Sequence, residues 1–357
     1  MKSSLSAADS PPVRFAALGL DHIHALGQVA MLLRSGAEFA AWYGAGNDFS
    51  PLFEKSFPQV RRAADPGEIL EDPSIALVTC AAVPDRRARL ATLAMQHGKD
   101  VFVDKPGAVT LEELEELRAV QRETGRIWTV YFSERIESPA TVKAVELVRA
   151  GAIGRPLQTV GLGPHQLGLA PRPDWFWDPQ RSGGILGDLT THQIDQFLIV
   201  TGCERAEIVS AQVANYSHPE KPEFEDFGDL LLRASSATGY ARVDWYTPDG
   251  LGTWGDGRLF ILGSEGAIEV RKNCDPAGRE GADHLFLVDG ESTRYLDCRD
   301  QPLPFAPALL RDVVERCETA MPQAHAFQVT EIALRAQAEA TRLGHLAGAQ
   351  GSRPNDG

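Results

Sequence analysis

Hydrophobic and polar residues follow two different patterns along this chain. Up to about residue 131, short apolar runs alternate with amphipathic stretches of helical spacing. This alternation is typical of a parallel sheet with crossover helices, so residues 13–131 are predicted to form a Rossmann-like domain. The predicted strands are 13–20, 37–44, 75–82, 100–106 and 127–133, and the clearest predicted helices are 24–36, 86–98 and 111–125.

Residues 132–347 are predicted to form a second, α+β domain. After a helix at about 139–150 and the turn GAIGRP, long alternating segments dominate, which favours a large open, mostly antiparallel sheet. One helix at 183–202 interrupts them, and a helix around 325–347 closes the chain. The predicted strands are 157–163, 206–217, 228–235, 238–247, 257–264, 266–272 and 284–290. Residues 1–12 and 348–357 are expected to be mobile tails.

Composition narrows the class of protein. The chain has 357 residues, 43% of them hydrophobic, which is enough for two domains with their own cores. The net charge of −14 argues against wholesale binding to nucleic acid or to an anionic membrane. The five cysteines are scattered, and no two of them form a CxxC motif. Neither a signal peptide nor a run of about 18 apolar residues is evident. A cytoplasmic protein is expected.

The segment Asp104-Lys105-Pro106 ends a predicted Rossmann strand. Ligands of open α/β sheets bind beyond the carboxyl ends of the strands, so Lys105 is expected to point into the binding crevice. A solvated lysine at a strand end is the alternative interpretation.

The predicted helix 183–202 carries the second candidate motif. Asp188 and His192 are four residues apart, so they share one face of a helix, and the glycines before them allow another segment or a ligand to approach closely. A surface ion pair, or a buried histidine bonded by the aspartate, is the alternative.

Together the two motifs resemble those of the glucose–fructose oxidoreductase/inositol dehydrogenase (Gfo/Idh/MocA) family, as do the turn GAIGRP and the segment FILGSEGAIEV. The resemblance implies an NAD(P)-dependent oxidoreductase acting on a secondary hydroxyl of a sugar, glycoside or cyclitol, or on the matching ketone. It also implies that Lys105, Asp188 and His192 are catalytic. His192 suits a general base, Lys105 can donate a hydrogen bond to the reacting oxygen, and Asp188 would orient the hydroxyl or the imidazole.

The cofactor motif departs from the family pattern. The expected G-x-G-x-x-G reads GLDHIH, and Asp104 replaces the usual glutamate before the lysine. The second strand ends at Gly44 instead of an acid, with Asp48 as the nearest substitute, and the absence of a following arginine favours NAD, with NADP possible. The expected cofactor-binding residues are Gly19, Leu20, Asp21, His22, His24, Gly44, Asp48, Ala81, Pro84, Asp104, Lys105 and Pro106.

His22 and His24 raise the question of a metal. They are two residues apart, and the sequence shows no third ligand beyond Asp21 nearby, so no metal is predicted. They are expected instead at a helix N-terminus, bonded to loop carbonyls or to a phosphate oxygen.

The substrate side is expected in the second domain. Residues 161–184 are rich in aromatic and turn residues and lead into the helix of Asp188. Trp175 and Trp177 either contact substrate or anchor this loop on the core, while Tyr131, Glu134 and Arg135 border the cleft. The expected substrate-binding residues are Lys105, His165, Arg172, Trp175, Trp177, Asp188 and His192.

Two other functions stay open on the same residues. One is an NAD-dependent glycosidase or lyase that oxidises its substrate transiently, and the other is a non-catalytic regulator that senses a small ligand. In each case the partner is a small molecule, a sugar or polyol for the enzyme. An open sheet with one uncovered face further favours a homodimer or homotetramer.

Overall fold

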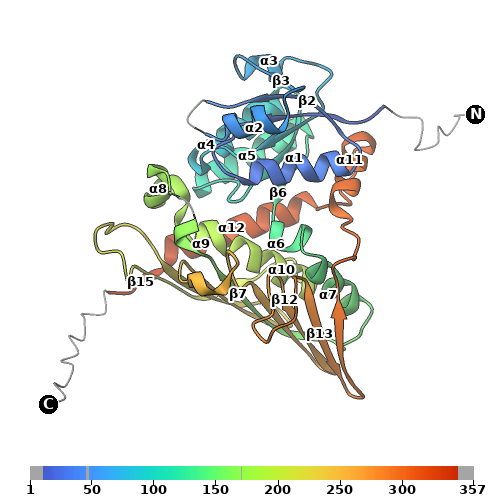
Figure 1. Ribbon diagram of the computed structural model, residues 1–357, viewed down its shortest axis with the longest axis vertical. Coiled ribbons are helices and arrows are strands. Elements are labelled where there is room, and N and C mark those ends of the chain that lie inside the picture. Colours follow the sequence, from blue (N-terminus) through green and yellow to red (C-terminus); the bar gives the residue numbers. More distant parts are fainter. Residues whose placement is uncertain (1–10, 46–47, 170, 345–357) are drawn as a thin grey trace, which may run out of the picture.

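The computed structural model describes residues 11–45, 48–169 and 171–344. Two sheets form separate layers, one in each part of the chain (Figure 1). The first sheet is entirely parallel, with the strand order β3-β2-β1-β4-β5-β6. Its strands are β1 (Arg14–Leu18), β2 (Glu38–Tyr43), β3 (Arg61–Arg62), β4 (Leu77–Cys80), β5 (Asp100–Asp104) and β6 (Trp128–Tyr131). The predicted Rossmann-like fold is confirmed.

Local signals set the ends of the helices that connect these strands. Pro84 occupies the first turn of α4, where its missing N–H costs no hydrogen bond. Thr110 and Glu113 form a capping box at the start of α5, and Gly125 ends that helix with a left-handed φ of 61°. The helices are α1 (His24–Arg34), α2 (Ser50–Ser56), α3 (Gly67–Leu70), α4 (Pro84–Gln96) and α5 (Leu111–Thr124).

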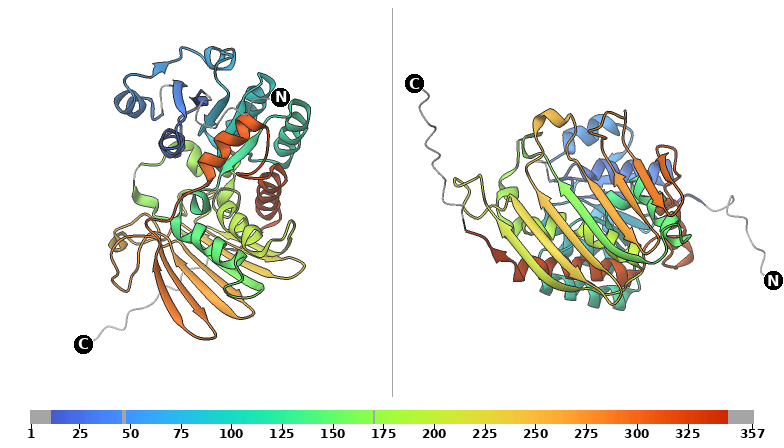
Figure 2. Two further views of the ribbon diagram at one scale, coloured as in Figure 1. Left: turned by 90° about the vertical axis from the view of Figure 1, so that its right-hand side faces the viewer. Right: turned by 90° about the horizontal axis from the view of Figure 1, so that it is seen from below.

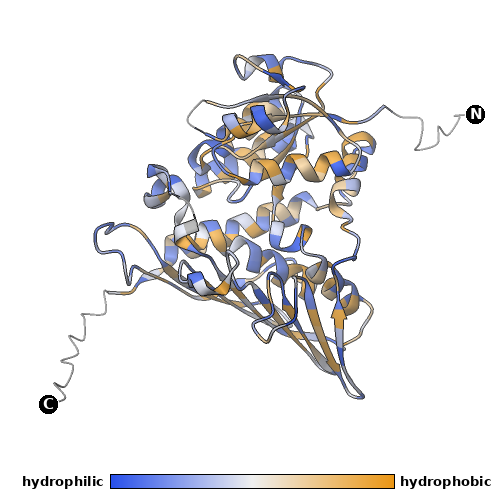
Figure 3. Ribbon diagram, in the orientation of Figure 1, coloured by the Kyte–Doolittle hydropathy of each residue, from blue (hydrophilic) through white to orange (hydrophobic). Residues whose placement is uncertain are grey.

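The second sheet is mixed and mostly antiparallel, as predicted. Its order is β14-β13-β12-β11-β7-β10-β9-β8-β15, and only the pairs β7–β10 and β8–β15 are parallel within the described residues. Hydrophobic and hydrophilic residues alternate along its strands (Figure 3). The strands are β7 (Pro156–Pro164), β8 (Glu207–Ala214), β9 (Phe227–Arg233), β10 (Thr238–Asp244), β11 (Arg258–Gly263), β12 (Gly266–Arg271), β13 (His284–Asp289), β14 (Thr293–Asp297) and β15 (Thr341–Arg342).

Helices join the two sheets. α7, α9, α10 and α12 pack on one face of the second sheet, while α12 also contacts α5 and β6, and α11 contacts α1. The C-terminal helices therefore return to the first part of the chain, and α12 lies between the two sheets (Figure 1). These helices are α6 (Ser133–Ile136), α7 (Pro139–Arg149), α8 (Pro179–Ser182), α9 (Gly184–Leu189), α10 (Thr191–Thr201), α11 (Phe305–Glu315) and α12 (Gln323–Glu339).

Two predicted helices were wrong in extent. The stretch 183–202 forms two helices, α9 and α10, which meet at Thr190, whose hydroxyl bonds the carbonyl of Leu186 at 2.5 Å. The closing helix ends at Glu339 rather than at 347, because Ala340 is extended and β15 pairs with β8. Residues 345–347 of that prediction lie outside the described residues.

The other face of the second sheet carries an apolar strip. Leu262, Ala267 and Val288 are register partners across β11, β12 and β13, and Leu262 and Val288 are exposed. No helix covers this face in the view from below (Figure 2, right). Assembly into a homodimer or homotetramer stays a prediction. None of the helices in the described ranges is long and apolar enough to cross a bilayer.

Candidate active site

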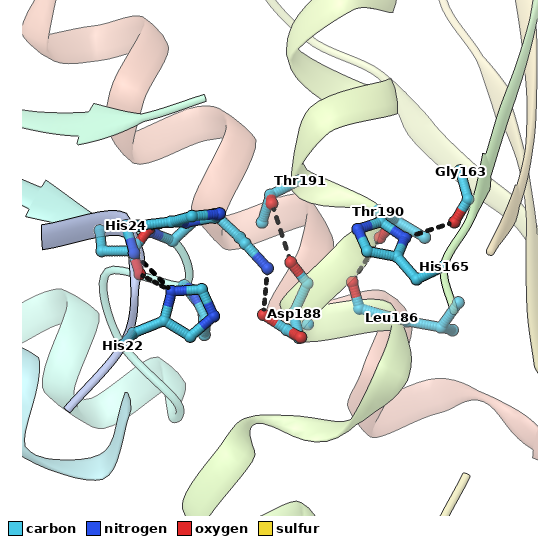
Figure 4. A network of polar contacts seen from close by, with 12 residues as sticks. His22, His24, Gly163, His165, Leu186, Asp188, Thr190 and Thr191 are labelled. Atoms are coloured by element: carbon cyan, nitrogen blue, oxygen red, sulfur yellow. Dashed lines mark hydrogen bonds and ion pairs between the residues drawn. The ribbon is translucent and has the colours of Figure 1, made fainter. Parts of the chain in front are cut away.

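The structure brings Lys105 and Asp188 together across the two parts of the chain. Lys105 follows β5 directly, Asp188 lies on α9, and their Nζ and Oδ1 atoms are 2.6 Å apart. The lysine side chain is 5% exposed and that of the aspartate 21% exposed, so the ion pair is largely shielded from water on the lysine side. Figure 4 shows Asp188 between the histidines of the first part and His165 of the second. Lys105 lies at the carboxyl end of its strand, and its place in a binding crevice stays a prediction.

Two neutral histidines lie close enough to Lys105 for its charge to lower their pKa values. His192 lies buried in the first turn of α10, and burial lowers its pKa to about 3, an effect that the charge of Glu134 offsets only in part. His165 follows β7, and burial lowers its pKa to about 4. Its Nδ1 lies 3.0 Å from the carbonyl oxygen of Gly163. Because a carbonyl only accepts, Nδ1 carries the proton and Nε2 has the free lone pair. Both imidazoles are therefore unprotonated at neutral pH.

A buried ion pair lies close enough to His192 to affect its pKa. Glu134 on α6 accepts hydrogen bonds from Lys272 at 2.5 Å and from Gln193 at 3.1 Å. Burial alone would raise the pKa of Glu134, but Lys272 lowers it to about 2. On the same helix, Arg135 pairs with Asp195 of α10 at 2.6 Å, which fixes α6 against α10. Sequence reasoning missed Lys272, although it directly follows β12 and continues the buried alternation of Ile268 and Val270, where a charge needs a partner.

An aromatic cluster lies beside Asp188, on the side predicted for the substrate. The guanidinium of Arg172 lies 4.7 Å from the Phe176 ring and 5.1 Å from the Trp245 ring. Trp177 packs against Phe176 and Phe224, and Trp175 is also partly buried against the core, so both tryptophans anchor the loop. A pocket beside Asp188 is lined by Phe176, Pro179, Ser182, Gly184, Ile185, Phe224, Glu225 and Trp245. Of the predicted substrate residues, Arg172 packs on two rings of this cluster and donates to the backbone carbonyls of Leu167 and Gln166.

The turn after β1 keeps one feature of a nucleotide site. Gly19 has a φ of 88°, and a Cβ there would lie 2.7 Å from the Cβ of Ala82, so only glycine fits. The carboxylate of Asp21 accepts a hydrogen bond from the backbone N–H of Val83, directly before α4, at 3.2 Å. Burial raises the pKa of Asp21. The first turn of α1 carries no acidic side chain that would repel a phosphate.

Asp48, the predicted substitute for the missing acid, lies close to Gly44, which directly follows β2. Asp48 Oδ1 accepts a hydrogen bond from Ser50 N at 2.9 Å, while Oδ2 is buried without a hydrogen-bond partner among the described residues. A Cβ at Gly44 would contact Asp48 and Leu20, so the glycine makes room for the carboxylate. Of the remaining predicted residues, Ala81 follows β4, Pro84 begins α4, and Pro106 follows Lys105 at the carboxyl edge of the sheet.

His22 and His24 both face Asp104, which is a correction to the predicted partners. Their Nδ1 atoms lie 3.3 Å and 2.9 Å from its carboxylate oxygens, and Arg87 lies 3.0 Å from the same carboxylate. Burial would raise the pKa of Asp104, but Arg87, His24 and His22 hold it well below its usual range. Burial also lowers the pKa of His22. The sequence suggested no third group because Asp104 is 80 residues from His24.

Known proteins share this architecture. The model of an oxidoreductase family with an NAD-binding Rossmann fold matches residues 15–132, and the model of the GFO/IDH/MocA C-terminal domain matches residues 141–269. A protein from Erwinia carotovora atroseptica SCRI1043, assigned to the oxidoreductases, aligns with a TM-score of 0.90 and 45% identity over 93% of this chain and 100% of its own. A levoglucosan dehydrogenase in complex with NADH and levoglucosan has the same fold, with a TM-score of 0.77 and 19% identity over 92% of this chain and 97% of its own.

The sequence relatives include enzymes of sugars and cyclitols. Scyllo-inositol 2-dehydrogenase (NAD(+)) of Bacillus subtilis (strain 168) is 30% identical over 209 residues, which span 58% of this chain and 58% of that enzyme. The alignment with 1,5-anhydro-D-fructose reductase of Ensifer adhaerens covers 76% of each chain at 27% identity. The two family models and the 45% identical structure cover both sheets and the site between them. The chain is therefore a member of the Gfo/Idh/MocA oxidoreductase family and carries its NAD-binding Rossmann domain.

Proposed function

We propose that this protein transfers hydride between a nicotinamide cofactor and a secondary hydroxyl of a sugar, glycoside or cyclitol, or the matching ketone. The observation that carries the proposal is the 2.6 Å contact between Lys105 and Asp188, with the unprotonated His192 nearby. A lysine, a carboxylate and a neutral imidazole are the groups that alcohol oxidation needs around one oxygen. The names of the relatives, an inositol dehydrogenase and an anhydrofructose reductase, support the substrate class.

The residues present fit a dinucleotide. Gly19 keeps the close turn, and the Asp21 carboxylate already accepts a hydrogen bond from Val83 N–H. The first turn of α1 contains no acidic residue. The unpartnered Oδ2 of Asp48 suits a ribose hydroxyl, which is a donor, and would repel a 2′-phosphate. We infer a preference for NAD over NADP. When bound, the nicotinamide would accept or deliver the hydride.

Side chains of the protein would accept the hydroxyl proton of the substrate and stabilise the charge on its oxygen. Lys105 would donate a hydrogen bond to the reacting oxygen and stabilise its negative charge as the hydroxyl proton leaves. His192 would take that proton, because its imidazole is unprotonated and the negative charge of Glu134 favours the imidazolium. Asp188 holds the Lys105 ammonium at 2.6 Å and so fixes where this donor points. In the reverse direction the same groups protonate a carbonyl as it is reduced.

The proposal is tested with the purified full chain in two steps. Calorimetric titration with NAD⁺, NADH, NADP⁺ and NADPH should show binding, tightest for the NAD forms. Sugars and cyclitols are then screened with the better cofactor for net formation or consumption of the reduced form. If no cofactor binds to folded protein, the proposal is wrong. Cleavage of a glycosidic bond without net redox change would instead support transient oxidation, and sugar binding without any turnover would support a regulator.

The pH dependence of oxidation tests the role of His192. A base must be unprotonated, and burial lowers the pKa of His192 to about 3, well below the usual value near 6.5. The plot of log kcat/KM against pH should therefore show no fall between pH 8 and about pH 5. A protonation with a pKa of 6 to 7 that controls kcat/KM and disappears in His192→Asn would contradict the neutral, buried base.

A further inference from the structure

Three potential metal ligands converge beside the active site. His22 and His24 flank the start of α1, Asp104 ends β5, and one ligand atom from each lies within 4.8 Å of the others. Asp104 is 0% exposed, while the two imidazoles are partly open at 26% and 28%. In Figure 4, the dashed lines from the two histidine rings run to the same carboxylate, that of Asp104.

Two hydrogen-bond acceptors, His22 Nδ1 and Asp104 Oδ2, face each other in this cluster. The backbone N–H of His24 lies 3.3 Å from His22 Nδ1, which places the lone pair of His22 on that nitrogen. The same nitrogen lies 3.3 Å from Asp104 Oδ2, which is buried and accepts no hydrogen bond from the described residues. Arg87 stands 3.0 Å from Oδ2 and supplies charge without a directed hydrogen bond. A lone pair facing a carboxylate oxygen is repulsive unless a cation binds both.

We propose that His22, His24 and Asp104 bind a divalent transition-metal ion of the zinc class. Two imidazole nitrogens and a carboxylate are a ligand set that suits zinc and its neighbours. Ligand atoms at about 2.0–2.1 Å from one tetrahedral zinc lie about 3.4 Å apart, close to the 3.3 Å between His22 Nδ1 and Asp104 Oδ2. Water or an oxygen of a bound nucleotide would complete the coordination.

The surroundings hold the ligands in place. The backbone N–H of Lys105 donates to Asp104 Oδ1 at 2.8 Å, and with Arg87 this fixes the carboxylate. The ring of His24 packs edge-on against Tyr131 at 5.3 Å between centroids. Because Lys105 follows Asp104 directly, an ion here would connect the start of α1 to the catalytic lysine. The site does not depend on the proposed oxidoreductase activity.

The test uses the full chain, treated with chelator and kept free of nucleotide. Titration with zinc chloride in a calorimeter should show one site per chain, and cobalt(II) should give visible absorption bands of a low-coordinate ion. His22→Gln and Asp104→Asn should each weaken zinc binding at least tenfold. His97→Gln, a change of an exposed histidine at the end of α4, should leave it unchanged.

Three results would overturn the proposal. The wild-type chain takes up no zinc, or His22→Gln binds it as well as the wild type does, or His97→Gln weakens it equally. In these cases the imidazoles serve only as hydrogen-bond partners of Asp104. Circular dichroism checks the fold of each variant, and the partly exposed His22 keeps the test valid if Asp104→Asn does not fold. Cofactor titrations are separate, so failure of the metal site leaves the proposed function standing.

Discussion

Replacement of Lys105 by methionine should lower kcat/KM for alcohol oxidation by about 10²–10³-fold, with little change in stability. Methionine fills similar space but donates no hydrogen bond, so the developing charge on the substrate oxygen loses its donor. The loss corresponds to about 2.7–4 kcal/mol of transition-state stabilisation. Asp188 loses its partner, but it is 21% exposed and water can solvate it. Steady-state kinetics with the best sugar, together with calorimetric binding of the cofactor, measure the effect.

Lys99 provides a matched control for this experiment. It is also a buried lysine, and it lies immediately before β5 while Lys105 lies immediately after it, so the two flank the same strand. Its Nζ donates to the carbonyl of Asp72 at 2.5 Å, at the amino end of β5, opposite the end that carries Lys105. Lys99→Met should retain kcat/KM within about threefold. If Lys105→Met also keeps its activity, or if both variants lose it equally, the catalytic assignment of Lys105 is wrong.

Most of the fold could be predicted because its strands and helices carry strong local signals. β4 and β5 are buried on both faces, so their sequences LVTC and DVFVD show no alternation of apolar and polar residues between their ends. Glycines such as Gly98 and Gly125 mark helix ends by their left-handed conformation. β14 gave no such signal, because its residues are exposed or half-exposed along its whole length. The two-residue β3 and β15 exist only through their neighbours in the sheets.

The sequence predicted only those site residues that belong to a recognisable motif. The structure joins Lys105 to Asp188, two residues that the resemblance implied to be catalytic, and the charge of Lys105 acts on the pKa of His192. The partners of Asp104 and of Glu134 could not be read from the sequence, because they come from segments 80 and 138 residues away. Such pairs form when the two sheets and the helices between them assemble. Their only sequence signal is a charged residue at a buried position of a strand.

Removal of Lys272 should destabilise the protein by about 3–5 kcal/mol. Lys272→Met leaves the carboxylate of Glu134 buried, with Gln193 as its remaining hydrogen-bond partner at 3.1 Å. Both side chains are almost fully buried, at 4% and 5% exposure, so water cannot replace the lost charge. Urea denaturation of the full chain at pH 7 measures the change in the free energy of unfolding.

The pH dependence separates this ion pair from simple packing. In the wild type the folded-state pKa of Glu134 is about 2, below its unfolded value near 4.5. The pair therefore stabilises the fold above about pH 4.5, and this contribution is lost as the pH falls toward 2. In Lys272→Met the lowering charge is gone, burial raises the pKa of Glu134, and the loss of stability relative to the wild type should shrink as the pH falls from 7 to 5.

Two further variants show whether the buried charge is the cause. Glu134→Gln combined with Lys272→Met removes both charges, and it should recover more than half of the stability that Lys272→Met loses. Arg233→Met breaks an exposed pair with Glu207, whose side chains are 64% and 74% exposed, and should cost less than about 1 kcal/mol. A double variant no more stable than Lys272→Met would mean that the lysine acts through its packed alkyl chain. Gln193, which donates to Glu134, lies next to His192 on α10. A double variant that recovers the fold but has a reduced kcat would therefore indicate that the charge of Glu134 also acts on His192.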